Sequence, residues 1–269
     1  MKTVSLTVLG LLLLASTAAP WIAPHEPVRQ YRDNASEAPS RRFPMGTDEF
    51  GRDNWSRLLY AGRWSMLTAA LATTVSIACG VLMGLLAAAS GGWIENSILW
   101  LSDLTLSLPW LYVLFAVRGL LPLSIPAEQA MAGVVILIGL IGWAGPARLV
   151  RAAARASLDA DYVKAARSFG APALHIWRFH VLPSLRAILA PQVFVLAPRY
   201  VMAESALSFL GLGLGEPTPS WGSLLAGART SMVSGLPWWS LAPVLPLMLM
   251  TLACSQLVEK ELTKKEHSS

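Results

Sequence analysis

Six long apolar stretches decide what this chain of 269 residues can fold into. A helix that crosses a bilayer needs roughly 20 mostly apolar residues, because its backbone must satisfy its own hydrogen bonds in hydrocarbon. The chain is 54% hydrophobic and 14% charged, whereas a soluble domain carries about 25% charged residues. We therefore predict an all-α polytopic membrane protein with six transmembrane helices, at about residues 4–22, 66–89, 98–121, 130–150, 187–210 and 241–258.

The first apolar stretch has two interpretations. Lys2, a leucine-rich core and small residues at 16–19 resemble a cleavable signal peptide. The apolar run continues past these small residues to Trp21 and Ile22, which favours a retained first span over residues 1–24.

Basic residues in the loops indicate the orientation in the membrane. The segment 25–64 and the connection 148–186 each carry many Arg and Lys residues, so these two regions alone do not decide it. With six spans, the tail at 259–269 lies on the same side as the connection and adds Lys260, Lys264 and Lys265. We therefore expect both termini and the connection to be cytoplasmic, and the segment 25–64 to be extracytoplasmic.

A short amphipathic helix is predicted between the fourth and fifth stretches, over residues 161–169. Ser157 and Asp159 are suitable N-cap residues, and Gly170 supplies the left-handed residue that ends a helix. A helix this short is marginal in water and must dock to persist. The expected docking face consists of Tyr162, Ala165, Ala166 and Phe169. Pro183 is expected to break the chain before the fifth span. An ordinary interfacial helix is the alternative interpretation.

Several motifs together resemble one family of membrane proteins. Lys164-Ala165-Ala166, Gly170 and Leu182-Pro183 resemble the EAA loop of ABC-importer permeases. Residues 46–53, 56–60, 204–213 and 217–222 resemble segments of dipeptide, oligopeptide and nickel permeases. The resemblance runs from about residue 44 to about residue 252. It implies a single transmembrane permease domain over 1–269, with a five-span core at 65–258, a coupling loop at 151–186 and a cytoplasmic tail at 259–269.

The resemblance also implies the partners of such a chain. These are a second permease subunit, two cytoplasmic ATP-binding subunits, an extracytoplasmic solute-binding protein and the lipid bilayer, with no nucleic acid. ATP and Mg²⁺ would lie on the partner ATPases, and this chain has no phosphate-loop motif of its own. It is therefore expected to be a transport subunit with no catalytic residue, no metal site and no bound cofactor. The implied ATPase-coupling residues are Asp161, Tyr162, Lys164, Ala165, Ala166, Arg167, Phe169, Gly170, Leu182 and Pro183.

This sequence departs from the family pattern in two places. Lys164 stands where the family usually has Glu, which reverses the local charge beside the expected ATPase. The tail from Ser255 onward lacks the Gly-Asp…Leu-Arg-Asp pattern that is common after the last span. The first departure bears on the coupling to the ATPase or on the identity of that ATPase.

Ionisable residues inside the predicted spans are candidate functional groups, because charge is costly in hydrocarbon. They are Asp103, Arg199 and Glu204. They either line a passage for a charged solute or are structural, with Arg199 reaching the interface and Glu204 near the outer surface.

A second set of residues would face the solute-binding protein. These residues are Gly46, Asp48, Gly51, Arg52, Asp53, Pro217, Trp221 and Gly222. Between them, residues 55–64 are predicted to form an amphipathic helix at the membrane surface. A structural elbow is the alternative interpretation of this region.

Other function classes find less support. His175 and His180 lie five apart with no carboxylate to complete a metal site, and Cys79 and Cys254 lie within apolar runs. A membrane-bound enzyme would need a polar catalytic cluster, which the sequence does not offer. A secondary transporter or channel subunit would predict inverted repeats, and none is visible. The cargo stays open among peptides, nickel and other small solutes.

Overall fold

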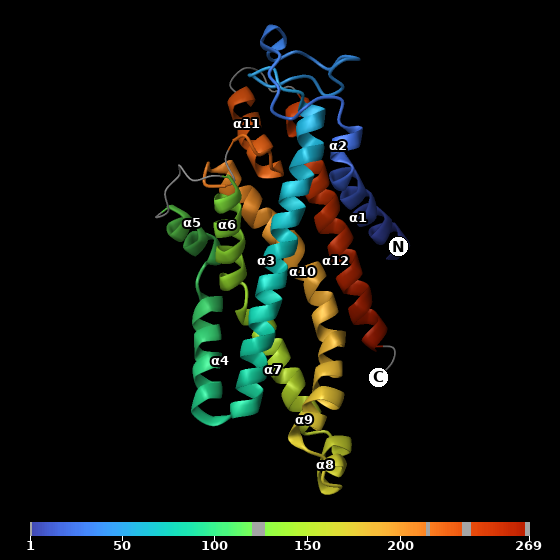
Figure 1. The fold of residues 1–269 in the computed structure, drawn as a ribbon, viewed down its shortest axis with the longest axis vertical. Coiled ribbons are helices and arrows are strands. Elements are labelled where there is room, and N and C mark those ends of the chain that lie inside the picture. The colour runs from blue at the N-terminus through green and yellow to red at the C-terminus, as the bar shows by residue number, and fades with distance from the viewer. Residues whose placement is uncertain (1, 120–126, 214–215, 233–237, 267–269) are drawn as a thin grey trace.

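The computed structural model describes residues 2–119, 127–213, 216–232 and 238–266, which form helices joined by turns and one long N-terminal loop (Figure 1). The described residues contain no β-strand, only an isolated antiparallel bridge between Thr47 and Asp53. The α-helices are α1 (Lys2–Thr17), α2 (Ala19–Ile22), α3 (Asn54–Ser90), α4 (Gly92–Ser107), α5 (Trp110–Gly119), α6 (Ala127–Ile141), α7 (Ala144–Leu158), α8 (Asp161–Ser168), α9 (Ala173–Ile176), α10 (Leu182–Phe209), α11 (Trp221–Met232) and α12 (Val244–Glu266). Two 3-10 turns, η1 (Arg32–Asn34) and η3 (Trp238–Leu241), and a π-helical turn, η2 (Trp177–Val181), complete the fold.

Among the described residues, three helices are long and apolar enough to cross a membrane, and they are Asn54–Ser90, Ala173–Phe209 and Trp239–Lys260. Two pairs of shorter helices would each cross as one bent span: Gly92–Ser107 with Trp110–Gly119, and Ala132–Ile141 with Ala144–Leu158. The first apolar stretch forms a helix that is shorter than a full span, Thr3–Thr17. The chain is therefore an all-helical, multi-pass membrane protein.

The third and fourth predicted spans are broken, whereas the sequence analysis expects each to be one helix. Gly92–Ser107 and Trp110–Gly119 meet at 85°. Leu108 at this break is extended, with ψ of 137°, because Pro109 excludes the helical conformation for the residue before it. The fourth span bends by 46° between Ile141 and Ala144.

Helix α3 corrects the expectation of a separate surface helix over residues 55–64. It continues without a break from Asn54 to Ser90, 37 residues, or about 55 Å at 1.5 Å per residue. Asp53 caps its first turn by accepting a hydrogen bond from the Ser56 amide. No proline follows before Gly91, which ends the helix at φ of 65°. Residues 55–64 thus form the N-terminal end of α3, continuous with the predicted second span.

Pro183 does not break the chain, contrary to the prediction. Helical backbone runs from Ala173 through the π turn into α10, with Pro183 in the first turn of α10. A proline is tolerated in the first turn of a helix, because an N–H there has no intrahelical acceptor to lose. Here the hydrogen-bond register changes from π to α just before Pro183. The predicted cap of α8 is also wrong, because its N-cap is Ala160, with no side-chain hydrogen bond. Ser157 instead meets the Ser184 hydroxyl at 2.8 Å.

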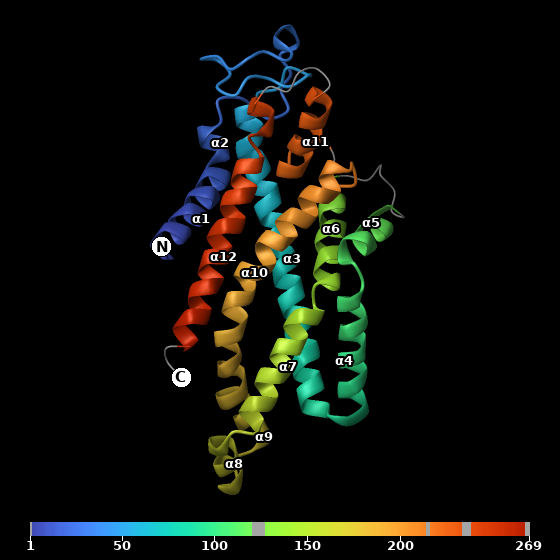
Figure 2. The same ribbon diagram turned by 180° about the vertical axis from the view of Figure 1, so that it is seen from behind.

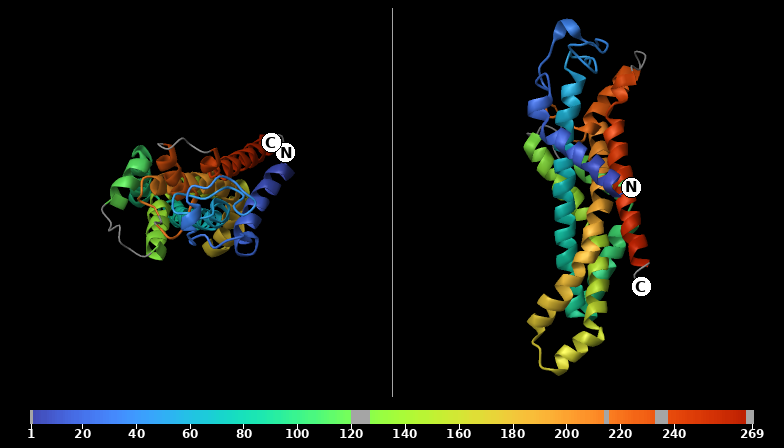
Figure 3. Two further views of the ribbon diagram at one scale, coloured as in Figure 1. Left: turned by 90° about the horizontal axis from the view of Figure 1, so that it is seen from above. Right: turned by 90° about the vertical axis from the view of Figure 1, so that its right-hand side faces the viewer.

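Helix α3 lies at the centre of an elongated bundle and packs against α6, α7 and α10, with α10 crossing in front of it in the view of Figure 2. Its buried side chains are nearly all small, which lets neighbouring backbones approach closely. A side chain on Gly80 would meet Pro146, and one on Gly84 would meet Val150, both on α7. Helices α1 and α12 pack together on another side of the bundle (Figure 3).

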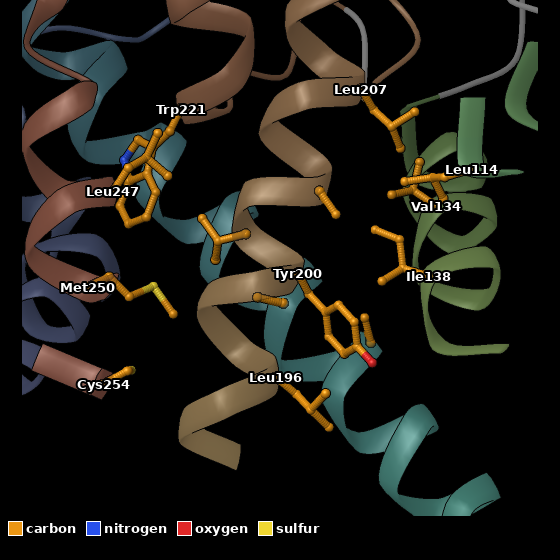
Figure 4. Packing of buried hydrophobic residues seen from close by; sticks show 14 of the residues in the cluster. Leu114, Val134, Ile138, Leu196, Tyr200, Leu207, Trp221, Leu247, Met250 and Cys254 are labelled. Atoms are coloured by element: carbon orange, nitrogen blue, oxygen red, sulfur yellow. The ribbon is translucent and has the colours of Figure 1, made fainter. Parts of the chain in front are cut away.

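The main apolar core surrounds α10 (Figure 4). Val134 and Ile138 of α6 lie on one side of this helix, and Leu247 and Met250 of α12 lie on the other. The hydroxyl of Tyr200 meets the Ser76 hydroxyl at 2.7 Å and ties α10 to α3. The core thus holds α10 rigidly along the middle of the bundle.

Candidate functional site

Helix α8 lies at one tip of the molecule, beyond the ends of α7 and α9 (Figure 1). Gly170 ends this segment at φ of 82°, which confirms the predicted glycine stop. Only Val163 of α8 is buried, and it packs into a small cluster with Ala88, Ala154, Ile176 and Val181. One valine therefore anchors α8 to the rest of the chain.

The predicted docking face of α8 has few partners within the described chain. Phe169 is 91% exposed and Tyr162 is 54% exposed. Ala165 is exposed and Ala166 is partly buried. Nearby Leu174, Phe179 and Leu182 are exposed as well. An exposed aromatic and apolar surface of this kind marks a site for another protein or a membrane.

The charges of α8 face solvent. Lys164 pairs with Asp161 on the same helix, with 3.1 Å from Nζ to Oδ1. Arg167 is exposed in the last turn. Lys164, at the position where the family usually has Glu, thus has an acidic neighbour of its own.

Two arginines of α7 hold α4 through one acid that the sequence analysis overlooked. Glu95, near the start of α4, accepts from Arg151 at 2.5 Å and from Arg155 at 2.7 Å. A signal for this site exists in the sequence, since Arg151 and Arg155 lie four residues apart on one helical face. The start of α4 is therefore held against the C-terminal half of α7.

Two of the three predicted intramembrane ionisable groups have partners near the bundle surface. Asp103 of α4 pairs with Arg148 of α7. The guanidinium of Arg199 lies over the Trp110 ring of α5, 4.7 Å from the ring centre. Both contacts join neighbouring helices of the bundle.

Glu204 is fully buried between α3, α10 and the start of α11. Its carboxyl group accepts hydrogen bonds from Ser65 at 3.1 Å and from Ser208 at 2.6 Å. Ser220 donates in turn to Ser208, and the Trp221 amide donates to Ser65. Glu204 therefore connects three helices through a continuous polar network.

The opposite tip of the molecule is formed by the loop 25–53 and the start of α3 (Figure 1). Gly46 and Gly51 have φ of 62° and 75°, as tight turns require. Asp48 accepts from the amides of Phe50 and Arg52 and pairs with the Arg52 side chain at 2.7 Å. The segment 46–53 is thus a folded structure with internal hydrogen bonds.

Glu216, in the loop between α10 and α11, joins this tip. It pairs with Arg52 and with Arg57, each at 2.8 Å. Burial acts to raise the pKa of Glu216, but the guanidinium groups of Arg57 and Arg52 outweigh it and hold this pKa below its ordinary value. The loop after α10 is therefore tied electrostatically to the start of α3.

The residues predicted to face a binding protein divide into two groups. Five of them are buried and serve turns, packing or capping: Gly46, Gly51, Asp53, Trp221 and Gly222. A side chain on Gly222 would collide with the Ser205 backbone. Pro217 is exposed, and Asp48 and Arg52 lie partly at the surface. Only the second group presents side chains that a partner can contact.

A sequence model of the family described as binding-protein-dependent transport system inner membrane component matches residues 80–259. This match includes α8 and Glu204. The chain belongs to this family. As an inner membrane component, it is placed in the bacterial inner membrane, in agreement with its long apolar helices.

Two relatives cover most of this inner membrane component. The di/tripeptide transport system permease protein DppC of Pseudomonas aeruginosa (strain UCBPP-PA14) is 36% identical over 250 residues, 90% of this chain and 80% of the relative. The dipeptide transport system permease protein DppC of Bacillus subtilis (strain 168) is 31% identical over 236 residues, 88% of this chain and 72% of the relative.

Proposed function

We propose that this chain is a transmembrane subunit of an ATP-driven ABC importer that takes up small peptides. The family membership gives the transport class, and the names of the relatives supply the cargo class. The observation that carries the coupling mechanism is the exposed aromatic surface of α8, at the tip where a partner can reach it. Tyr162 and Phe169 are the side chains that a partner ATPase would contact.

The coupling is mechanical and involves no chemical step on this chain. Closure of the ATPase dimer displaces α8, and the helical stretch Ala173–Phe209 transmits the shift. This stretch carries Glu204, which accepts a hydrogen bond from Ser65 of α3, and Ser65 in turn accepts from the Trp221 amide at the start of α11. A movement at one tip can thus change the packing near the other. ATP and Mg²⁺ bind to the partner subunits.

The proposed topology has six spans, with the bent helix pairs and α1 each counted as one. The α8 tip, the residues 161–183 and both termini face the cytoplasm. The loop 25–53 and Pro217 face outward, toward a solute-binding protein. A second permease subunit completes the pathway in the bilayer.

Site-specific crosslinking tests the coupling proposal directly. A photoreactive amino acid at Phe169 in the assembled importer is expected to crosslink to an ATP-hydrolysing subunit. The same amino acid at Trp100, an exposed position on α4, is the matched control and should not reach that subunit. Absence of any such crosslink from Phe169 and from Tyr162, in a complex that transports, would overturn the coupling role of α8.

A further inference from the structure

A groove of about 790 Å³ opens between α1, α3 and α10, and Met250 of α12 contributes to its lining. Its walls belong to the membrane-crossing parts of α3 and α10. The hydrocarbon region of a bilayer holds no bulk water. A groove at this place is therefore filled by lipid or by another transmembrane segment.

The polar groups of the groove gather at one end. Arg63 of α3 and Ser16 and Thr17 of α1 lie together there, since the Ser16 hydroxyl meets the Met66 sulfur at 3.5 Å. Arg63 also marks the end of the apolar part of α3, because residues 64–94 contain no charged side chain. A long arginine side chain at such a boundary reaches the head-group layer of the membrane.

Arg63 has a charge to offer at this end. Its side chain is exposed, and within the described part of the chain it forms no ion pair. Its guanidinium lies over the Tyr60 ring, 5.8 Å from the ring centre. Arg52 and Arg57, nearer the tip, are already paired with Glu216. Among the described residues that line the groove, Arg63 alone is charged, so an anionic group meets attraction there and no repulsion.

The opposite end of the groove is apolar. Ile77 and Ala78 of α3 and Val193 of α10 line it. From Arg63 to Ala78 the groove follows α3 for about 22 Å, at 1.5 Å per residue. One leaflet of hydrocarbon is about 15 Å deep, half of the bilayer core. The groove thus changes from cationic to apolar over the depth of a leaflet, as an amphiphile with an anionic head requires.

One hydroxyl in the groove has no partner among the described residues. Thr73 is 4% exposed, and its Oγ1 makes no hydrogen bond there. A threonine in a helix can donate to the carbonyl four residues back, as Thr74 does to Ala70 at 2.9 Å. Thr73 therefore does not require a polar ligand. The charge of Arg63, which an uncharged partner helix would leave without a counter-charge, favours a lipid as occupant.

We propose that this groove binds an anionic phospholipid in the leaflet on the side of the loop 25–53. The guanidinium of Arg63 pairs with the lipid phosphate. One acyl chain runs along Ala70, Thr74 and Ala78, whose small side chains leave room for it. The lipid fills the space between α1 and α10. The inference goes beyond the proposed function and rests on the membrane environment of the chain, not on its cargo.

The test uses the complete importer, reconstituted with its partners in lipid nanodiscs. The probe is phosphatidylglycerol with a diazirine on one acyl chain, and labelled positions are mapped by mass spectrometry after illumination. We expect labelling within residues 66–78 and 193–197, about fivefold weaker with a phosphatidylcholine probe that carries the same chain, since one arginine attracts an anionic lipid by that factor. Arg63→Gln should remove the difference between the two lipids. Ala70→Trp should fill the groove and reduce labelling by both.

Two variants serve as matched controls. Arg186→Gln removes an exposed arginine near the start of α10, and Leu82→Trp enlarges an exposed side chain of α3; neither position lines the groove. Both variants should keep the labelling and the preference for phosphatidylglycerol.

Two results for the wild-type complex would overturn the inference, whether or not the variants assemble. One is equal labelling of the groove by the two lipids, and the other is absence of labelling there. A photoreactive amino acid at Ala70 that crosslinks to the second permease subunit instead of lipid would also overturn it. ATP-dependent dipeptide uptake by the same preparation tests the proposed function separately, so a failure of one does not imply a failure of the other.

Discussion

The two tips of the molecule differ in whether their functional side chains have partners within the chain. At the tip formed by the loop 25–53, Asp48, Arg52, Arg57 and Glu216 pair with one another across segments far apart in the chain. At the α8 tip, the aromatic rings of Tyr162 and Phe169 point into solvent, and Val163 alone of α8 is buried.

The tip at 25–53 is stabilised by contacts within the chain, whereas the α8 tip exposes side chains that a partner can cover. The charged groups of the tip at 25–53 form ion pairs with one another, so much of its shape is set before any partner binds. The α8 tip leaves large apolar groups exposed, which another protein surface can cover with a gain in free energy. Changes at the α8 tip should therefore alter function, and changes at the tip at 25–53 should alter stability.

The largest effect is expected from Phe169→Ala. The side chain is 91% exposed, so its loss should leave the stability of the isolated chain unchanged. Aromatic residues often dominate binding energy at interfaces, and we expect ATP-driven uptake to fall about tenfold or more. Uptake into proteoliposomes and the thermal midpoint in detergent are the two measurements. Trp100→Ala is the control, and normal uptake by Phe169→Ala would contradict the comparison.

A smaller effect, on stability alone, is expected from Asp53→Ala. Asp53 caps α3 and is fully buried, and loss of such a cap costs about 1 kcal/mol. The thermal midpoint of the purified chain should fall. Asp33→Ala, at an exposed position in η1, should leave it unchanged. Equal midpoints for the two variants would show that the tip at 25–53 does not depend on this cap.

The smallest effect is a pH dependence centred on Glu216. Its pKa is lowered in the folded chain by Arg57 and Arg52, against the opposing effect of burial. The ion pairs therefore stabilise the fold above the ordinary Glu range, and this contribution is lost as the pH falls through the lowered pKa of Glu216. Glu216→Gln should lower the thermal midpoint at pH 7, and its effect should shrink at acidic pH as the wild-type carboxylate is protonated.

Glu26→Gln, at an exposed position in the same outer loop, is the control for this titration. It should have no pH-dependent effect on the midpoint. If Glu216→Gln differs from wild type by the same amount at both pH values, the carboxylate is not the source of the stabilisation.

Local features were the most predictable from sequence. The glycine stop at Gly170 and the exposed side chains of Tyr162 and Phe169 follow from residue type and helical spacing. The predicted breaks in the backbone were wrong in two places, at Pro183 and at residues 55–64. Pro183 lies within continuous helix because a π turn precedes it, and residues 55–64 join the long span α3.

Partners across the bundle could not be predicted. Glu95, which clamps α4 to α7, had no visible role in the sequence, although Arg151 and Arg155 carried a periodic signal. Trp221 and Gly222 resembled surface residues of a loop but are buried against α3 and α10. Such pairings depend on which helix faces meet, and helix spacing alone does not specify that.

The membrane environment and the helical class could be inferred from the amino-acid sequence, because apolar length and backbone hydrogen bonding act within each segment, and the family could be inferred from local motifs. The partners of the charged groups became visible only in the folded bundle. Glu204 meets a serine 139 residues away, and Arg57 meets a glutamate 159 residues away. A buried charged group needs hydrogen-bond or ion-pair partners, and which residues become its partners depends on how all the helices of the bundle pack.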